Sequence, residues 1–179
     1  MAVEITDLLH PDGTENPSGL STLHGYALLS DFATIQRPKD LHEADATLAN
    51  IAAIATAHVF KAGKSMKKVY ATQNMNEMSF EPVGEEDSIG QKGTVTLKHP
   101  GSKKEADGLA RLLNSSNTIW FIQETDGKVR QFGSERFPAK ARVAYATGNN
   151  EAYRGYTITI TAYTAGVLYE PGLNFTPAA

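Results

Sequence analysis

Hydrophobic and polar residues alternate most regularly in residues 156–163, which read Tyr-Thr-Ile-Thr-Ile-Thr-Ala-Tyr. Because successive side chains of a strand point to opposite faces of a sheet, this segment is predicted as a strand with one buried face and one threonine-rich face. Residues 93–98, Gly-Thr-Val-Thr-Leu-Lys, show the same two-residue period. Both segments are typical of half-buried strands.

Several other segments are rich in β-branched and aromatic residues and are also predicted as strands. Residues 118–124 hold the only tryptophan, and an Asp126-Gly127 turn follows, which is the pattern of a β-hairpin returning through residues 128–132. The other predicted strands are 68–72, 142–146 and 167–169, the last as an extension of the strand at 156–163.

One helix is predicted after Pro100. Ser102 and Glu105 form a capping-box pattern at its start, and Asn114-Ser-Ser-Asn117 marks its end. Apolar residues recur between them with helical spacing, so this stripe must pack on another element. The stripe consists of Ala106, Leu109, Ala110 and Leu113. Leu109, Ala110 and Leu113 are the residues expected to pack the helix on a sheet.

The N-terminal third has weaker signals. Residues 44–57 are alanine-rich, which favours a helix by intrinsic propensity, but the isoleucines among them suit a strand equally well. Residues 20–35 fit either a strand or a buried loop. Both alternatives stay open for both segments.

The order of these elements predicts a mainly β fold, an antiparallel β-sandwich or barrel with one flanking α-helix. Residues 1–179 are expected to form a single domain, because that length suits one hydrophobic core. An extended loop is predicted at residues 73–92. Residues 1–43 and 171–179 are predicted as arms.

Composition narrows the function classes. Hydrophobic residues make up 41% and charged residues 21%, which is typical of a globular chain, and the net charge of −3 offers no excess of Lys and Arg for phosphates. The absence of cysteine excludes disulfides and Cys-ligated zinc. No catalytic, phosphate-binding or metal-ligand motif was found, so the sequence favours a protein that is not an enzyme and has no cofactor or metal.

The sequence was also compared with the patterns of signal peptides and membrane-spanning segments. The start of the sequence does not resemble a signal peptide. The longest apolar run is far shorter than the roughly 20 residues that span a bilayer. The expectation is therefore synthesis in a cytoplasm and no contact with a membrane.

The polar segment 73–92 is the main candidate functional feature, because loops of that length are usually functional or disordered. Its acidic residues do not have the spacing of a calcium loop, and a solvated loop is the simpler interpretation. The candidate residues in it are Met78, Phe80, Glu81, Glu85, Glu86 and Asp87.

Residues 66–170 carry a recognisable series of elements. A strand at 93–97 is followed by the capped helix 102–113, the tryptophan strand and hairpin 119–132, and the closing strand 155–162. Gly133-Ser, Phe137-Pro-Ala-Lys140 and Thr147-Gly148 lie between the last two. In the order of these elements and in their residue patterns, the chain resembles the tail tube proteins of bacteriophages and related injection systems.

This resemblance implies a structural virion protein that assembles in the bacterial cytoplasm. Its subunits would form homohexameric rings by joining sheets edge to edge, and the rings would stack into a hollow tail tube. The loop at 73–92 would reach the adjacent ring, and the arms would add inter-ring contacts. The implied partners are further copies, other tail proteins, and DNA that passes through the lumen without specific binding; a modest negative charge suits that passage.

Two alternatives remain beside the tail tube. One is a different phage structural protein, such as a capsid decoration or tail-completion protein. The other is a small β-barrel that binds a ligand.

Overall fold

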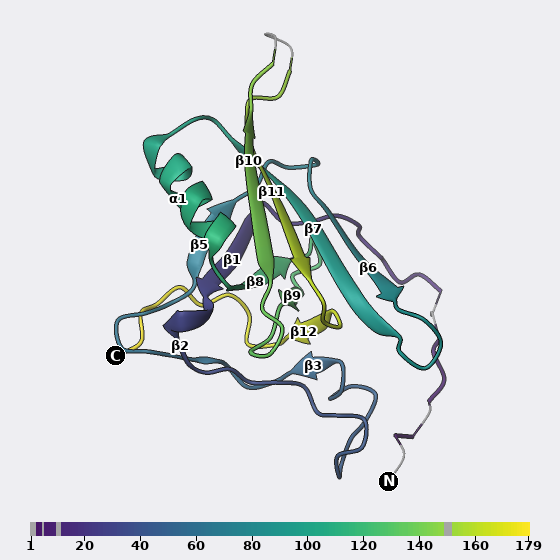
Figure 1. The fold of residues 1–179 in the computed structure, drawn as a ribbon. Coiled ribbons are helices and arrows are strands. Elements are labelled where there is room, and N and C mark those ends of the chain that lie inside the picture. Colours follow the sequence, from purple (N-terminus) through teal and green to yellow (C-terminus); the bar gives the residue numbers. More distant parts are fainter. Residues whose placement is uncertain (1–2, 5, 10–11, 149–151) are drawn as a thin grey trace.

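The computed structural model describes residues 3–4, 6–9, 12–148 and 152–179. In this part of the chain, strands predominate and a single α-helix is present (Figure 1), which confirms the predicted mainly β fold with one helix. The elements are β1 (Leu23–Leu28), a 3-10 turn (Leu29–Asp31), β2 (Phe32–Thr34), β3 (Ala53–Ile54), β4 (Val59–Phe60), β5 (Lys67–Tyr70), β6 (Glu77–Val83), β7 (Gly90–Pro100), α1 (Lys104–Ser115), β8 (Thr118–Gln123), β9 (Val129–Phe132), β10 (Lys140–Ala146), β11 (Gly155–Ala162) and β12 (Val167–Tyr169).

Two sheets form the body of the molecule. The larger has the strand order β3-β12-β9-β8-β1-β5, and the smaller has the order β10-β11-β7-β6. All pairings are antiparallel except the short parallel contact between β12 and β3. Helix α1 packs on β10 and lies at the side of the molecule where β5 ends the larger sheet (Figure 1). The arrangement is a sandwich with one flanking helix.

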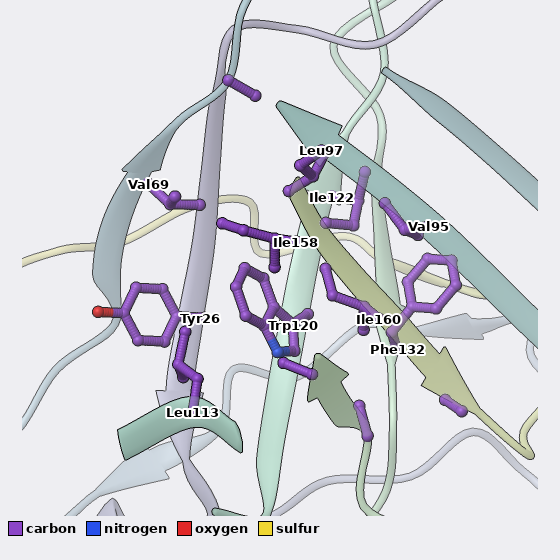
Figure 2. Close-up of a cluster of buried hydrophobic side chains, with 14 residues drawn as sticks. Tyr26, Val69, Val95, Leu97, Leu113, Trp120, Ile122, Phe132, Ile158 and Ile160 are labelled. Atoms are coloured by element: carbon purple, nitrogen blue, oxygen red, sulfur yellow. The ribbon is translucent and has the colours of Figure 1, made fainter. Parts of the chain in front are cut away.

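The first hydrophobic core lies between the two sheets. Trp120 of β8 is completely buried and stacks on Tyr26 of β1, with ring centroids 5.0 Å apart. Side chains from β7 and β11 meet it from the smaller sheet (Figure 2). These are Val95, Leu97, Ile158 and Ile160. The face of residues 156–162 predicted to be buried is therefore the face that fills this core.

A second core covers the opposite face of the larger sheet. It is closed by the β2–β4 ribbon and by Leu173 and Phe175. Strand β8 is consequently buried on both faces, because Ile119 and Phe121 point into the second core while Trp120 points into the first. Burial on both faces explains why its sequence is a continuous apolar run rather than an alternation.

The polar segment 73–92 is not a long loop. Half of it forms strand β6 and the beginning of β7, and residues 84–89 connect the two strands. The prediction of a loop was wrong because β6 is an edge strand, in which charged residues and Pro82 interrupt the apolar pattern.

The predicted capping box is also wrong. Lys103 is the N-cap residue of α1, and no side chain caps the helix. The chain bends at Gly101, which has a φ of 90°, so the helix begins after Ser102. Glu105 and Asp107 lie in the first turn instead, where negative charge favours the helix dipole. The helix ends at Ser115, within the predicted stop at 114–117.

Part of the region predicted as an N-terminal arm, residues 23–34, belongs to the fold. Strand β1 lies between β8 and β5 in the larger sheet, because its apolar side chains enter both cores. Residues 44–57 form turns and the two-residue strand β3, so neither a helix nor a full strand occupies them. Residues 1–2, 5 and 10–11 of the predicted arm lie outside the described residues.

The C-terminal region differs from prediction as well. Strand β12 does not extend β11 but joins the larger sheet between β9 and β3. Residues 171–179 are not a loose arm, since the backbone of Ala178 exchanges hydrogen bonds of 2.9 Å with Gly63 and Lys64. Apolar packing of Leu173 and Phe175 holds this segment on the second core.

Candidate functional site

Two of the candidate loop residues point into the protein. Phe80 of β6 stacks on Phe132, with ring centroids 4.8 Å apart, and Met78 packs against the first core. Their positions follow from the register of β6 with β7, which places Met78 opposite the buried Val95. These two side chains hold the β6–β7 hairpin on the sandwich and do not reach outward.

The acidic candidates divide into two groups. Glu81 lies on β6 and forms an ion pair of 3.1 Å with Lys92 across the hairpin. The remaining three, Glu85, Glu86 and Asp87, are exposed in the connection 84–89. That connection projects beyond the body of the molecule beside β6 and β7 (Figure 1). We call residues 84–89 the acidic tip.

The predicted packing residues of the helix lie where α1 meets the sandwich. Leu113 is buried in the first core and Leu109 packs against it. Ala110 is half-buried beside them. Tyr156 of β11 also fixes the helix, because its hydroxyl donates a 2.5 Å hydrogen bond to Oδ1 of Asp107. This bond to a carboxylate raises the pKa of Tyr156 to about 12.

The smaller sheet presents a polar face on the side away from the first core. Thr159 lies opposite Thr96, and Thr161 opposite Thr94, in adjacent strands. Every second residue of the four strands lies on this side. We define the polar face as Glu77, Ser79, Glu81, Lys92, Thr94, Thr96, Lys98, Lys140, Arg142, Ala144, Thr157, Thr159 and Thr161.

The two edges of the smaller sheet differ. Strand β6 has no strand partner on its outer side among the described residues. Strand β10 is partly covered, because Asn114 of α1 donates to the carbonyl of Val143 (3.1 Å) and accepts from its N–H (2.7 Å). The amide of Asn114 thus replaces a strand partner at one position. From the sequence, Asn114 was predicted only to end the helix. Its contact with Val143 has no local signal, because the two residues are 29 positions apart.

A groove lies between α1 and β5. It has a volume of about 210 Å³, and apolar side chains of α1 and the sandwich form its floor. Lys68, Lys103 and Glu105 contribute charged groups to its lining. Strand β5 ends the larger sheet, so no further strand in the described part of the chain pairs with its outer edge.

Two buried histidines serve the fold. His58 accepts a hydrogen bond from the N–H of Gln36 at Nδ1 (3.0 Å), so Nε2 carries the proton and donates to Oε1 of Gln131 (2.7 Å). Burial lowers the pKa of His58, although the Gln131 contact opposes this. The ring is therefore a neutral, hydrogen-bonded part of the second core.

His24 of β1 is completely buried. Its Nδ1 accepts a hydrogen bond from the N–H of Gln123 (3.2 Å), whereas Nε2 has no partner among the described residues. Burial lowers the pKa of His24 to about 4. The spacing of the histidines in the sequence had argued against a metal motif. No sequence pattern indicated that His24 would be completely buried.

Within the described residues, no three side chains of metal-ligating type are grouped. No helix there is long and apolar enough to cross a membrane. Comparisons with family models, curated proteins and solved structures found no match. The functional argument therefore rests on the surfaces described above.

Proposed function

We propose that this chain is a structural subunit that joins copies of itself through the edges of the smaller sheet, as in the rings of a phage tail tube. The observation that carries the proposal is the smaller sheet itself. One of its faces is anchored on a hydrophobic core, the other is a continuous polar face, and its edge strand β6 is open.

An open edge strand is a template for pairing with another chain unless it is blocked. In β6 only Pro82 and the flanking charges act against such pairing. A neighbour that places its β10 against β6 would continue the sheet, and a closed ring of such contacts leaves no edge of the smaller sheet uncovered. Asn114 blocks β10 only at Val143, which leaves the part of β10 toward Ala146 for the neighbour.

The polar face would then line the inside of the ring. It carries four basic residues and two acidic ones. The net charge of this face is therefore positive, although that of the whole chain is negative. Lys92 is paired with Glu81, and Lys98 donates to the hydroxyl of Thr157 (2.7 Å). Because these amines already have partners, the face suits passage of DNA better than tight binding of phosphates.

The acidic tip is the part of the β6–β7 hairpin proposed to contact the next ring. Phe80 anchors the hairpin in the sandwich, so removing the whole hairpin would damage the core. A sharper variant replaces Glu85, Glu86 and Asp87 with Ser. We expect this variant to fold and form rings that no longer stack.

Cysteine cross-linking tests the edge contact directly, because the chain has no cysteine of its own. In one molecule β6 and β10 are three strand spacings apart, about 14 Å, which exceeds the Cα separation of about 7 Å that a disulfide tolerates. Ser79→Cys combined with Ala144→Cys or Arg142→Cys can therefore cross-link only between copies.

We expect oxidation to give a ladder of covalent multimers that ends at the ring size, and negative-stain electron microscopy to show rings or tubes. Ser79→Cys combined with Thr159→Cys, which lies on the inner strand β11, is the matched control and should give no covalent multimers on oxidation. A wild-type chain that stays monomeric at every concentration, together with β6–β10 cysteine pairs that give no ladder, would refute the proposal.

The ligand-binding alternative has less support. The space between the sheets is filled by large buried side chains such as Trp120, Phe132 and Ile160. A barrel that holds a ligand needs that space to be open.

A further inference from the structure

The segment before the first strand exposes two leucines. Leu8 is fully exposed, and Leu9 retains 80% of its exposure. Both lie in a stretch without helix or strand. The surroundings are acidic: the first 36 residues contain five carboxylates and no Lys or Arg, and Asp7 directly precedes the leucines. Adjacent exposed leucines cost free energy in water unless a partner covers them.

The groove between α1 and β5 has complementary properties. Its volume of about 210 Å³ is enough for an apolar side chain, because a cavity of about 150 Å³ can hold benzene. Its floor includes Leu109 and Ala106, and its rim carries Lys68 and Lys103. Lys104 follows at the exposed start of α1, and Glu105 is the acidic group in the lining.

The edge of β5 adds main-chain hydrogen bonds to this site. Antiparallel pairing with β1 uses only alternate N–H and C=O groups of a strand, so the others point outward. One of these outward groups, the carbonyl oxygen of Tyr70, already has a hydrogen-bond partner, because Nδ1 of His99 lies 2.9 Å from it. An extended peptide that lies along Lys67–Tyr70 can bond to the remaining groups, which is the usual mode of strand addition.

We propose that residues 6–9 of a second copy add to β5 as an extra strand. In a strand, neighbouring side chains point to opposite faces. One leucine would enter the groove beneath α1, and the other would meet the opposite face of the larger sheet, where Phe175 lies against Lys68. Glu4 and Asp7 have opposite parity in the added strand, so one would face Lys103 beside α1 and the other Lys68 beside Phe175. The two adjacent leucines thus match a sheet edge with apolar surface on both sides.

The donor is a second copy because of where the segment lies. In Figure 1 the described part of the N-terminal segment runs down the side of β6, away from α1 and β5. The inference rests on the proposed self-association of the chain. It names a contact separate from the β6–β10 edge, and it does not require that tubes form.

Two full-length variants test the exchange by complementation. Leu8→Ser with Leu9→Ser removes the donor and keeps the groove, whereas Ala106→Trp fills the groove and keeps the donor. We expect each variant alone to associate at least about tenfold more weakly than the wild type, since burying a leucine contributes that factor or more. An equimolar mixture should restore one-to-one heterodimers in analytical ultracentrifugation.

Matched controls separate this contact from general effects. Leu112→Trp enlarges an exposed residue on the same helix outside the groove lining and should associate like the wild type. If Ala106→Trp does not fold, Lys68→Glu with Lys103→Glu replaces it, and Asp7→Lys with Glu4→Lys in the second chain should restore binding. A mixture that stays monomeric, or variants that associate like the wild type, would overturn the inference.

A labelled peptide of residues 3–12 distinguishes this result from that of the proposed function. It should bind the Leu8→Ser, Leu9→Ser chain in fluorescence anisotropy and should not bind when Ala106→Trp is added. Peptide binding without rings in electron microscopy would refute the tube and keep this contact. Rings without peptide binding would do the reverse.

Discussion

Replacement of His24 by Gln should remove a defined part of the acid sensitivity of this protein. The ring is completely buried, and its pKa falls from 6.5 to about 4 because burial disfavours the charged form. Between these values the unfolded chain binds a proton that the folded chain excludes, so stability falls as the pH falls. The contribution of the neutral His24 ring to the free energy of unfolding is fully present above pH 6.5 and is lost below about pH 4.

The size of the effect follows from the two pKa values. One pKa unit corresponds to about 1.4 kcal/mol, so the full loss is about 3 kcal/mol, of which about 2 kcal/mol is lost by pH 5. Gln can still accept the hydrogen bond from Gln123 through its amide oxygen, but it does not titrate. The variant should therefore lose about 2 kcal/mol less than the wild type between pH 7.5 and pH 5.

Urea unfolding at several pH values measures this difference. Fluorescence of Trp120, the only tryptophan and a completely buried one, reports the transition. His58 has a pKa that burial also lowers, so the wild type will lose more than His24 alone accounts for. His58→Gln is the matched comparison. Equal pH slopes for the wild type and His24→Gln would show that His24 gains its proton without opposing the fold.

Three further predictions concern stability at neutral pH. Asn114→Ala removes both hydrogen bonds to Val143 and should cost about 1–2 kcal/mol in urea unfolding; light scattering should also show more association, because the edge of β10 is then open. Gly166→Ala places a Cβ 2.4 Å from the ring of Phe80, so we expect a loss of about 1–3 kcal/mol, and an unchanged melting temperature would contradict that packing. Gly108→Ala meets open space in the middle of an exposed helix and should stabilise by about 1 kcal/mol in the same assay, unless the helix frays there.

The sequence predicted the strands in which one face is buried and the other is wet. Strands β7 and β11 keep a strict two-residue period because a shift by one residue would move every apolar side chain out of the core. Strand β8 was recognised from composition alone, since burial on both faces removes the alternation. These three strands supply half of the buried residues of the first core.

Sequence patterns are less informative where long-range contacts decide the structure. Strand β1 contains His24 and Gly25, which are poor strand residues by propensity, yet it is an inner strand. A Cβ at Gly25 would lie 3.1 Å from Leu173, a residue far along the chain. No local pattern can report such a contact.

The candidate site was predicted only in part. The exposed carboxylates of the acidic tip were correctly separated from the core by their charge. Met78 and Phe80 were placed with them, because the two-residue period of β6 was hidden between Glu77, Glu81 and Pro82. Edge strands carry such residues to resist unwanted pairing, so the residues that mark β6 as an edge strand also hide its two-residue period.

The position of β12 has a consequence for the order in which the protein folds. Among the residues that the structure describes, strand β3 pairs only with β12, and the N–H of His58 donates to the hydroxyl of Tyr169, 111 residues later in the chain. A ribosome delivers the N-terminal residues first, so residues 53–60 must wait, with apolar groups exposed, until residues 167–169 emerge. Contacts of such long sequence separation also slow folding in free solution. The second core should therefore form late in folding, and chains in which it is incomplete would still expose Ile54 and Phe60 to water.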